Sequence, residues 1–259
     1  MDGDLLAAAL LGIFGLIFGS FLNVCILRWP KEESVVRPPS RCPGCGNGIA
    51  WYDNVPVLSW LILRGRCRHC QTPISPMYPA IEFATALIWL LCGFHWSLTI
   101  AALKALVFFT ILLGIAMTDA REYIIPDQFS IGGLVLGLVF SVLGGVPEIG
   151  RALLGAAVGF GGLWAVGALG SMIFKKEAMG GGDIKMMAMV GAFVGWQGVL
   201  LTIFLGALLG SVIFLPMQIL RGEREKEVPF GIFLALGAAT TYLLGPAIIS
   251  WYTHYLTTG

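Results

Sequence analysis

Long runs of apolar residues dominate this chain and restrict what it can fold into. The first run, residues 5–27, contains no charged side chain. A hydrocarbon core about 30 Å thick is crossed by about 20 helical residues, so runs of this length are expected to span a membrane. The acidic flank formed by Asp2 and Asp4 is unlike the basic start of a cleavable signal, which predicts a permanent helix. Further runs cover residues 80–96, 98–118, 129–145, 152–174, 184–220 and 230–252.

The balance of residue types agrees with a membrane protein. Of the 259 residues, 57% are hydrophobic and 12% are charged, whereas soluble chains carry about 25% charged residues. This excludes a disordered protein and an ordinary soluble domain. The net charge of +1 provides no overall field that attracts a polyanion, so we expect no nucleic-acid partner. The lipid bilayer is the expected surrounding.

The positions of the cations predict the topology. If the basic segments are cytoplasmic, 14 of the 16 Lys and Arg residues lie inside, as the positive-inside rule requires. These segments are residues 28–78, Arg121, Lys175, Lys176, Lys185, Arg221, Arg224 and Lys226. Both termini are then outside. Because both flanks of residues 184–220 are inside, this stretch should cross twice, with a break near residues 195–198. The prediction is an all-α polytopic membrane protein of about eight transmembrane helices.

Two Cys-x-x-Cys pairs lie in the loop between the first two spans. Cys42 and Cys45 form one pair, Cys67 and Cys70 the other, and 21 residues separate them. Each pair can present two thiolates to one tetrahedral ion, and four thiolates leave no open position for water, so a structural zinc site is expected. Two disulfides are the alternative, which a reducing cytoplasm disfavours. A Pro-rich loop of this size has little core of its own, so metal would stabilise it.

Acidic residues beside spans are costly and mark functional sites. By the predicted topology, Asp119 closes the third span and Asp183 opens the sixth, so both lie at the inner membrane edge. Two carboxylates at equal depth can activate a water and protonate a leaving group. Simpler alternatives stay open: Asp183 could cap its helix, and Asp119 could pair with Arg121 or a nearby lysine. Asp127 could cap the fourth span or tune the other two acids.

These residues also carry a resemblance to a known family. Gly180-x-Gly182-Asp183, followed by Lys185, together with Asp119 and Pro126-Asp127, resembles the prepilin peptidases of type IV pilus and type II secretion systems. Further similar motifs are Gly19-Ser20-Phe21-Leu22-Asn23-Val24, Arg28-Trp29-Pro30, Ser40-Arg41-Cys42-Pro43, Asn54-Val55-Pro56-Val57-Leu58-Ser59-Trp60, Arg64-Gly65-Arg66-Cys67, Ile74-Ser75, Tyr78-Pro79, Glu82, Pro229-Phe230-Gly231 and Ala235-Leu236-Gly237. The resemblance covers essentially the whole chain.

The resemblance implies a bifunctional enzyme of the bacterial inner membrane. Asp119 and Asp183 match the catalytic pair of an aspartyl endopeptidase that removes the basic leader of prepilins and pseudopilins at the cytoplasmic face. Gly180, Gly182, Asp127 and Lys185 are then supporting residues. The new terminal residue, usually Phe, is methylated on its amine with S-adenosylmethionine, an activity associated with the cysteine loop. No Gly-rich nucleotide fingerprint locates the methyl donor; Glu82 is a candidate for holding the substrate amine, and an ordinary helix-end acid is the alternative.

This interpretation divides the chain into three parts by role, and three alternative functions stay open beside it. Residues 1–27 form the first transmembrane helix, 28–79 the cytoplasmic zinc loop associated with methyl transfer, and 80–259 the transmembrane peptidase domain. The alternatives are a peptidase without methyl transfer, a proton- or metal-coupled transporter that uses the acids as a relay, and a zinc-bearing scaffold without chemistry.

Overall fold

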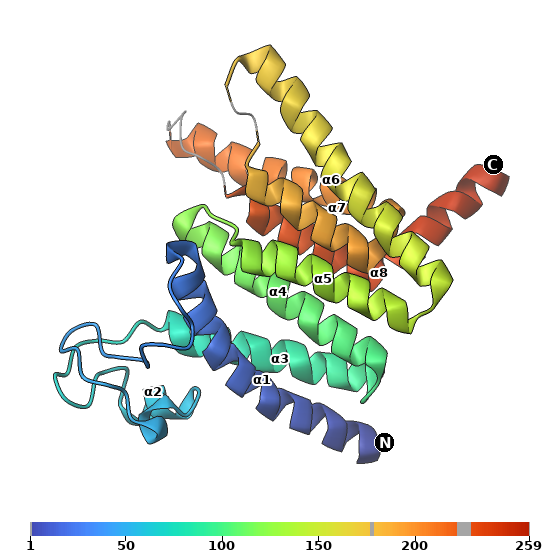
Figure 1. Cartoon of the computed structure of the whole chain (residues 1–259). Coiled ribbons are helices and arrows are strands. Elements are labelled where there is room, and N and C mark those ends of the chain that lie inside the picture. Colours follow the sequence, from blue (N-terminus) through green and yellow to red (C-terminus); the bar gives the residue numbers. More distant parts are fainter. Residues whose placement is uncertain (1, 177–178, 222–228, 259) are drawn as a thin grey trace. The chain divides into compact units, whose positions relative to one another are not determined.

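The computed structural model describes residues 2–176, 179–221 and 229–258. Arg224 and Lys226, which entered the topology prediction, lie outside the described residues. The described chain is helical, and its β-structure is limited to two isolated bridges in the cysteine loop (Figure 1). Its elements are α1 (Asp2–Arg28), η1 (Trp29–Lys31), η2 (Trp51–Asn54), α2 (Leu58–Ile62), α3 (Met77–Trp96), α4 (Ile100–Glu122), α5 (Asp127–Leu143), α6 (Val146–Phe174), α7 (Gly181–Arg221) and α8 (Phe230–Thr258).

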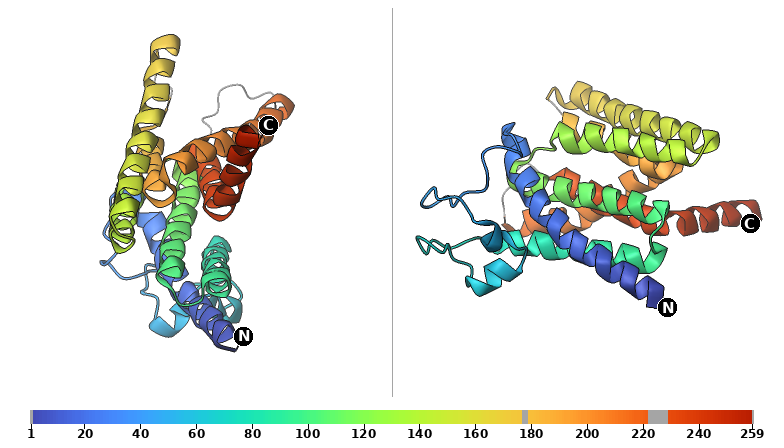
Figure 2. Two further views of the ribbon diagram at one scale, coloured as in Figure 1. Left: turned by 90° about the vertical axis from the view of Figure 1, so that its right-hand side faces the viewer. Right: turned by 60° about the horizontal axis from the view of Figure 1, so that its bottom comes forward.

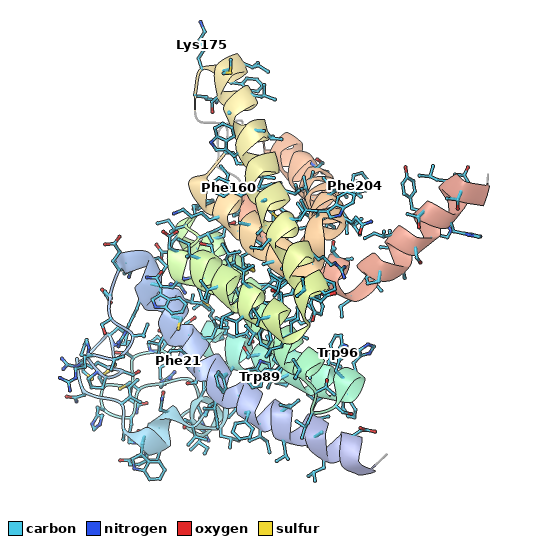
Figure 3. All side chains as sticks on the ribbon, turned by 45° about the vertical axis from the view of Figure 1, so that its right-hand side comes forward. Phe21, Trp89, Trp96, Phe160, Lys175 and Phe204 are labelled. Atoms are coloured by element: carbon cyan, nitrogen blue, oxygen red, sulfur yellow. The ribbon has the colours of Figure 1, made fainter. Side chains whose placement is uncertain are left out.

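The helices confirm a multi-pass membrane protein. Six of them in the described chain are long and apolar enough to cross a membrane, and α5 is a shorter apolar helix. Large apolar side chains cover their outer faces: Phe160 on α6 is 47% exposed and Phe204 on α7 is 63% exposed (Figure 3). Exposed apolar surface of this extent suits contact with lipid rather than water.

The bounds of the helices agree closely with the apolar runs, except that α8 continues to Thr258, beyond the expected residue 252, and that α6 starts early. This helix begins at Val146, earlier than the expected residue 152. Proline at its first turn is compatible with a helix start, because the missing N–H would have no partner there. Glu148 and Arg151 form an ion pair one turn apart on the helix, with Arg151 Nη1 3.8 Å from Glu148 Oε1. The helix therefore includes these two charged residues, which lie outside the expected apolar run.

The chain forms two compact units, Met1–Thr110 and Ile111–Gly259. In the first unit, α1 packs along α3, and the cysteine loop connects them (Figure 2). The two helices approach closely at Gly15 and Gly19 of α1. A Cβ on either glycine would lie 2.7 Å from the Cα of Ala86 or of Glu82, respectively. Such contact between small residues is how membrane helices associate when no water drives them together.

In the second unit, α7 packs against α5, α6 and α8. Gly195 interrupts α7 with φ 76° and ψ 175°, a conformation that favours glycine. Beyond the break, Gly198 lies beside Thr241 and Gly206 beside Leu234, so the second arm of α7 runs antiparallel to α8 (Figure 1). The predicted break at residues 195–198 is therefore present. With α7 counted as two arms and the five-residue helix α2 left out, the described residues form eight helical segments, which approximately matches the expected eight transmembrane helices.

The interface between α6 and α7 gives a first test of this packing. A Cβ on Gly159 would lie 2.1 Å from the carbonyl oxygen of Met187. A Cβ on Gly161, two residues further along α6, would meet nothing within 4 Å. We expect Gly159→Ala to destabilise the protein by about 1–3 kcal/mol through overpacking. Gly161→Ala should leave stability unchanged or slightly raised. Thermal unfolding in detergent measures both; equal melting temperatures for the two variants would contradict the packing.

Candidate functional site

Asp119 and Asp183 lie together in the second unit. Asp119 is in the last turn of α4, and Asp183 is in the first turn of α7. The two carboxyl groups are close enough for their charges to interact directly. The helix ends that the predicted topology placed at one membrane depth therefore lie near one another.

The start of α8 holds the Asp119 side chain. The backbone N–H of Ile232 donates a hydrogen bond to Asp119 Oδ2 at 3.2 Å. This N–H belongs to the first turn of α8, where backbone donors have no partner within the helix and the helix dipole favours a negative charge. Gly231 makes the approach possible, because a Cβ there would lie 2.9 Å from Asp119 Oδ2.

Asp183 is half-buried and keeps free hydrogen-bonding capacity. Its Oδ1 atom is buried and has no hydrogen-bond partner among the described residues. Next to it in sequence, Gly182 packs on Ile125, since a Cβ on this glycine would lie 3.0 Å from the Cβ of Ile125. Ile125 also approaches Gly231, at 2.9 Å from a Cβ built there. This side chain thus links the starts of α7 and α8 beside the two acids.

Asp127 makes an ion pair instead of joining the two acids. Its Oδ1 lies 2.7 Å from Lys185 Nζ, and both side chains are largely exposed. The prediction that Asp127 caps the fourth span is wrong: Asp127 is the first residue of α5, and the capping position is Pro126. Asp183 likewise lies inside the first turn of α7, which begins at Gly181. The ion pair ties the start of α5 to the start of α7 near the acids.

The four loop cysteines converge as predicted. The Sγ atoms of Cys42, Cys45, Cys67 and Cys70 all lie within 4.8 Å of one another. All are free thiols, so the disulfide alternative does not hold in this structure. The Sγ atoms of Cys42 and Cys70 are 3.6 Å apart, which is near the edge of about 3.8 Å of a tetrahedron with Zn–S bonds of about 2.3 Å. The cluster fits a structural zinc ion.

Each cysteine pair is held by the same backbone pattern, repeated 25 residues later. In the first pair, Cys42 N–H donates to Asn47 O and Ile49 N–H to Ser40 O; in the second, Cys67 N–H donates to Thr72 O and Ile74 N–H to Gly65 O. Positive φ occurs at equivalent positions, Gly46 and Gln71. The two halves are therefore matched knuckles that present their sulfurs to a common centre.

Polar neighbours support the second knuckle. The Thr72 hydroxyl lies 3.1 Å from Cys70 Sγ, and its hydrogen bond lowers the pKa of the Cys70 thiol to about 6, which favours the metal-binding thiolate. Arg68 makes a bidentate pair with Asp53 at 2.6–3.1 Å, and this hydrogen bonding lowers the pKa of the Asp53 carboxyl. The pair fixes the knuckle to η2.

Glu82 lies in the first unit. It is 8% exposed, and its Oε2 accepts the backbone N–H of Val57 at 2.7 Å. The described structure therefore gives Glu82 a contact with the cysteine loop, while its predicted role toward a substrate amine stays a prediction. Sequence reasoning missed the contributions of Ile125 and the Ile232 N–H to the acid pair, although Gly231 belongs to a motif that the sequence singled out.

The helices and the two acids define a class of protein: a multi-pass membrane protein with paired carboxyl groups at one end of a helix bundle. Residues 13–96 match the model of the bacterial peptidase A24 N-terminal domain, and residues 106–215 match that of the type IV leader peptidase family.

Three relatives are named prepilin leader peptidase/N-methyltransferase. The protein of Myxococcus xanthus is 40% identical over 87% of this chain and 69% of its own length. The protein of Aeromonas hydrophila is 36% identical over 96% of this chain and 94% of its own length. The protein of Pseudomonas aeruginosa is 34% identical over 94% of this chain and 92% of its own length. No solved structure matches the chain. This chain belongs to the type IV leader peptidase family.

Proposed function

We propose that this chain is a membrane aspartyl endopeptidase that removes the basic leader of prepilins or pseudopilins and then methylates the new terminal amine with S-adenosylmethionine. The observation that carries the peptidase half is the approach of Asp119 and Asp183 at one end of the second unit. The names of the relatives support both halves. The proposed place of action is the cytoplasmic face of the bacterial inner membrane, with both termini outside.

The chemistry follows from the different surroundings of the two acids. In the proposed reaction, one carboxylate removes a proton from a water molecule, which attacks the scissile carbonyl, and the other carboxyl group protonates the departing amine. Asp119 is held in place by the Ile232 N–H. Asp183 Oδ1 is without a partner in the described structure and is available to orient the water. Gly180 leaves room for the acid, since a Cβ there would lie 3.2 Å from Asp183 Oδ2, and Gly182 packs on Ile125.

The contact between α8 and Asp119 gives a prediction for the peptidase. Gly231→Ala places a methyl group 2.9 Å from Asp119 Oδ2, so the carboxyl group must move. Since small misplacements of catalytic groups cost about 100-fold in rate, we expect leader cleavage to fall by about that factor. Gly210→Ala is the matched control, because its Cβ makes only ordinary contacts, at 3.4 Å or more, with the rings of Phe233 and Phe230. Cleavage rates with a synthetic prepilin measure both; a Gly231→Ala enzyme of normal rate would contradict the proposed geometry.

The methyl transfer is proposed for the first unit. S-adenosylmethionine supplies a methyl group on a cationic sulfur when bound. The protein must present a neutral amine to that group. The proposed division by role assigns residues 1–27 to the first membrane helix, 28–79 to the zinc loop associated with methyl transfer, and 80–259 to the peptidase domain. In the zinc loop, Cys42, Cys45, Cys67 and Cys70 would hold the metal, whose role is structural because four thiolates complete its coordination.

One experiment separates the candidate functions. Purified protein is incubated with a synthetic prepilin and S-adenosylmethionine, and the products are read by mass spectrometry. We expect the leader-free peptide carrying one additional methyl group. A cleaved but unmethylated product would reduce the function to a peptidase, and an intact substrate would refute the proposal. The transporter interpretation is not favoured, because Asp119 and Asp183 lie at helix ends rather than at the middle of spans.

A further inference from the structure

A cavity of about 570 Å³ lies in the first unit between the cysteine loop and the adjoining ends of α1 and α3. Its wall includes Val24, Trp60 and Leu63, and its polar floor is made by Ser20, Asn23 and Glu82. The volume falls in the range of about 300–1,000 Å³ typical of sites for small organic ligands. The peptidase chemistry proposed above uses none of these residues.

Asn23 lines this cavity and keeps an unused hydrogen-bond acceptor. Its side chain is 3% exposed, and its Nδ2 donates to the backbone oxygen of Tyr78 at 3.0 Å, which fixes the orientation of the amide. The opposite atom, Oδ1, is buried and has no hydrogen-bond partner among the described residues. A buried carbonyl without a donor is costly, so a ligand that offers an N–H or O–H group would be favoured here.

Glu82 adds a second acceptor on the same floor. Only 8% of Glu82 is exposed, and its carboxylate accepts hydrogen bonds from the Val57 N–H and the Ser20 side chain. No lysine or arginine forms an ion pair with Glu82 within the part of the chain that the structure describes. A buried carboxylate is stabilised best by a positive partner, so Glu82 favours a cationic group on the ligand. The basic side chains that also line the cavity, among them Arg28 and Arg41, suit an anionic group on the same ligand.

We propose that this cavity binds the methyl donor S-adenosylmethionine, with Glu82 and Asn23 accepting hydrogen bonds from the donor's α-ammonium group. This inference rests on the proposed methyl transfer and assigns it a site. The donor carries a sulfonium, an ammonium and a carboxylate group, and its N–H and O–H groups match two buried acceptors. Trp60 supplies an aromatic wall of the kind on which a purine ring stacks. The site adjoins Cys42 and Cys67, so the cysteine cluster shapes its rim.

Binding of radiolabelled S-adenosylmethionine to the full chain in detergent, measured by equilibrium dialysis, tests the site. We expect Glu82→Gln and Asn23→Leu each to weaken binding about tenfold or more, as loss of a buried hydrogen bond to a charged group predicts. Glu32→Gln is the matched control, because Glu32 is exposed and lies outside the cavity wall. Unfolding temperature and leader cleavage report whether each variant is folded.

A second measurement locates the donor without any substitution. Ultraviolet irradiation of the wild-type protein with the labelled donor, followed by digestion and mass spectrometry, should label peptides from residues 20–82. Label confined to residues 111–259, while methylation proceeds, would overturn the site but keep the proposed function. Normal donor binding by Glu82→Gln with lost methylation would assign Glu82 to the substrate amine and also overturn the inference. A wild-type protein that binds no donor and yields unmethylated product would refute methyl transfer itself.

Discussion

Replacing either Asp119 or Asp183 by asparagine is expected to abolish leader cleavage while the protein still inserts and folds. Each variant removes one member of a pair that must exchange protons with a water and a leaving amine. General acid–base catalysis contributes factors of about 10²–10⁴, so each single variant should lose at least this much. Because the two groups act as a unit, the double variant should be little worse than either single one. Initial rates with a synthetic prepilin measure the loss.

Glu122→Gln is the matched control for this experiment. Glu122 is an exposed acid in the same last turn of α4 as Asp119, so the substitution makes the same chemical change outside the pair. Its cleavage rate should stay within a few-fold of wild type. If a folded Asp119→Asn or Asp183→Asn protein cleaves at the wild-type rate, the assignment of the pair is wrong. An equal loss in all three variants would point to a general effect of acidic charge at this helix end.

The sequence was sufficient to predict the helices because membrane spans are set by length and polarity alone. The break in α7 was also predictable: both flanks of this long run are basic, and Gly195 takes the positive φ that the reversal requires. The early start of α6 was not predicted, because its first turns contain the charged residues Glu148 and Arg151, which interrupt the apolar pattern although they pair within the helix.

The candidate site was predictable where chemistry depends on residue type and not where it depends on packing. Cys-x-x-Cys spacing predicted the cluster, because each knuckle is local and its hydrogen bonds join residues a few positions apart. The meeting of Asp119 and Asp183 followed from topology. The support from Ile125 and the Ile232 N–H did not, since it arises only when α4, α7 and α8 converge. The cavity beside Glu82 likewise joins residues more than 50 positions apart.

Removal of the metal is expected to disorder the cysteine loop and stop methyl transfer, while leader cleavage continues. Structural zinc contributes about 10–16 kcal/mol of binding energy in zinc-finger peptides, which is folding energy when the site forms only in the folded chain. The knuckles here have only short backbone hydrogen-bonded turns besides the four sulfurs. We expect about one zinc per chain in the wild-type protein by elemental analysis, and much less in Cys42→Ser and Cys67→Ser.

Cysteines outside the cluster supply the control for the zinc experiment. Cys92 is buried in α3 and belongs to no cluster of metal-binding side chains within the described residues, so Cys92→Ser should keep the zinc and the methyl transfer. Hydrogen exchange should rise in residues 28–79 of the Cys42→Ser protein but not in α4 to α8, because Asp119 and Asp183 are held by the second unit. A wild-type protein with far less than one metal per chain, and with all four loop thiols open to labelling, would refute the zinc site. The proposed peptidase activity would not be affected by that result.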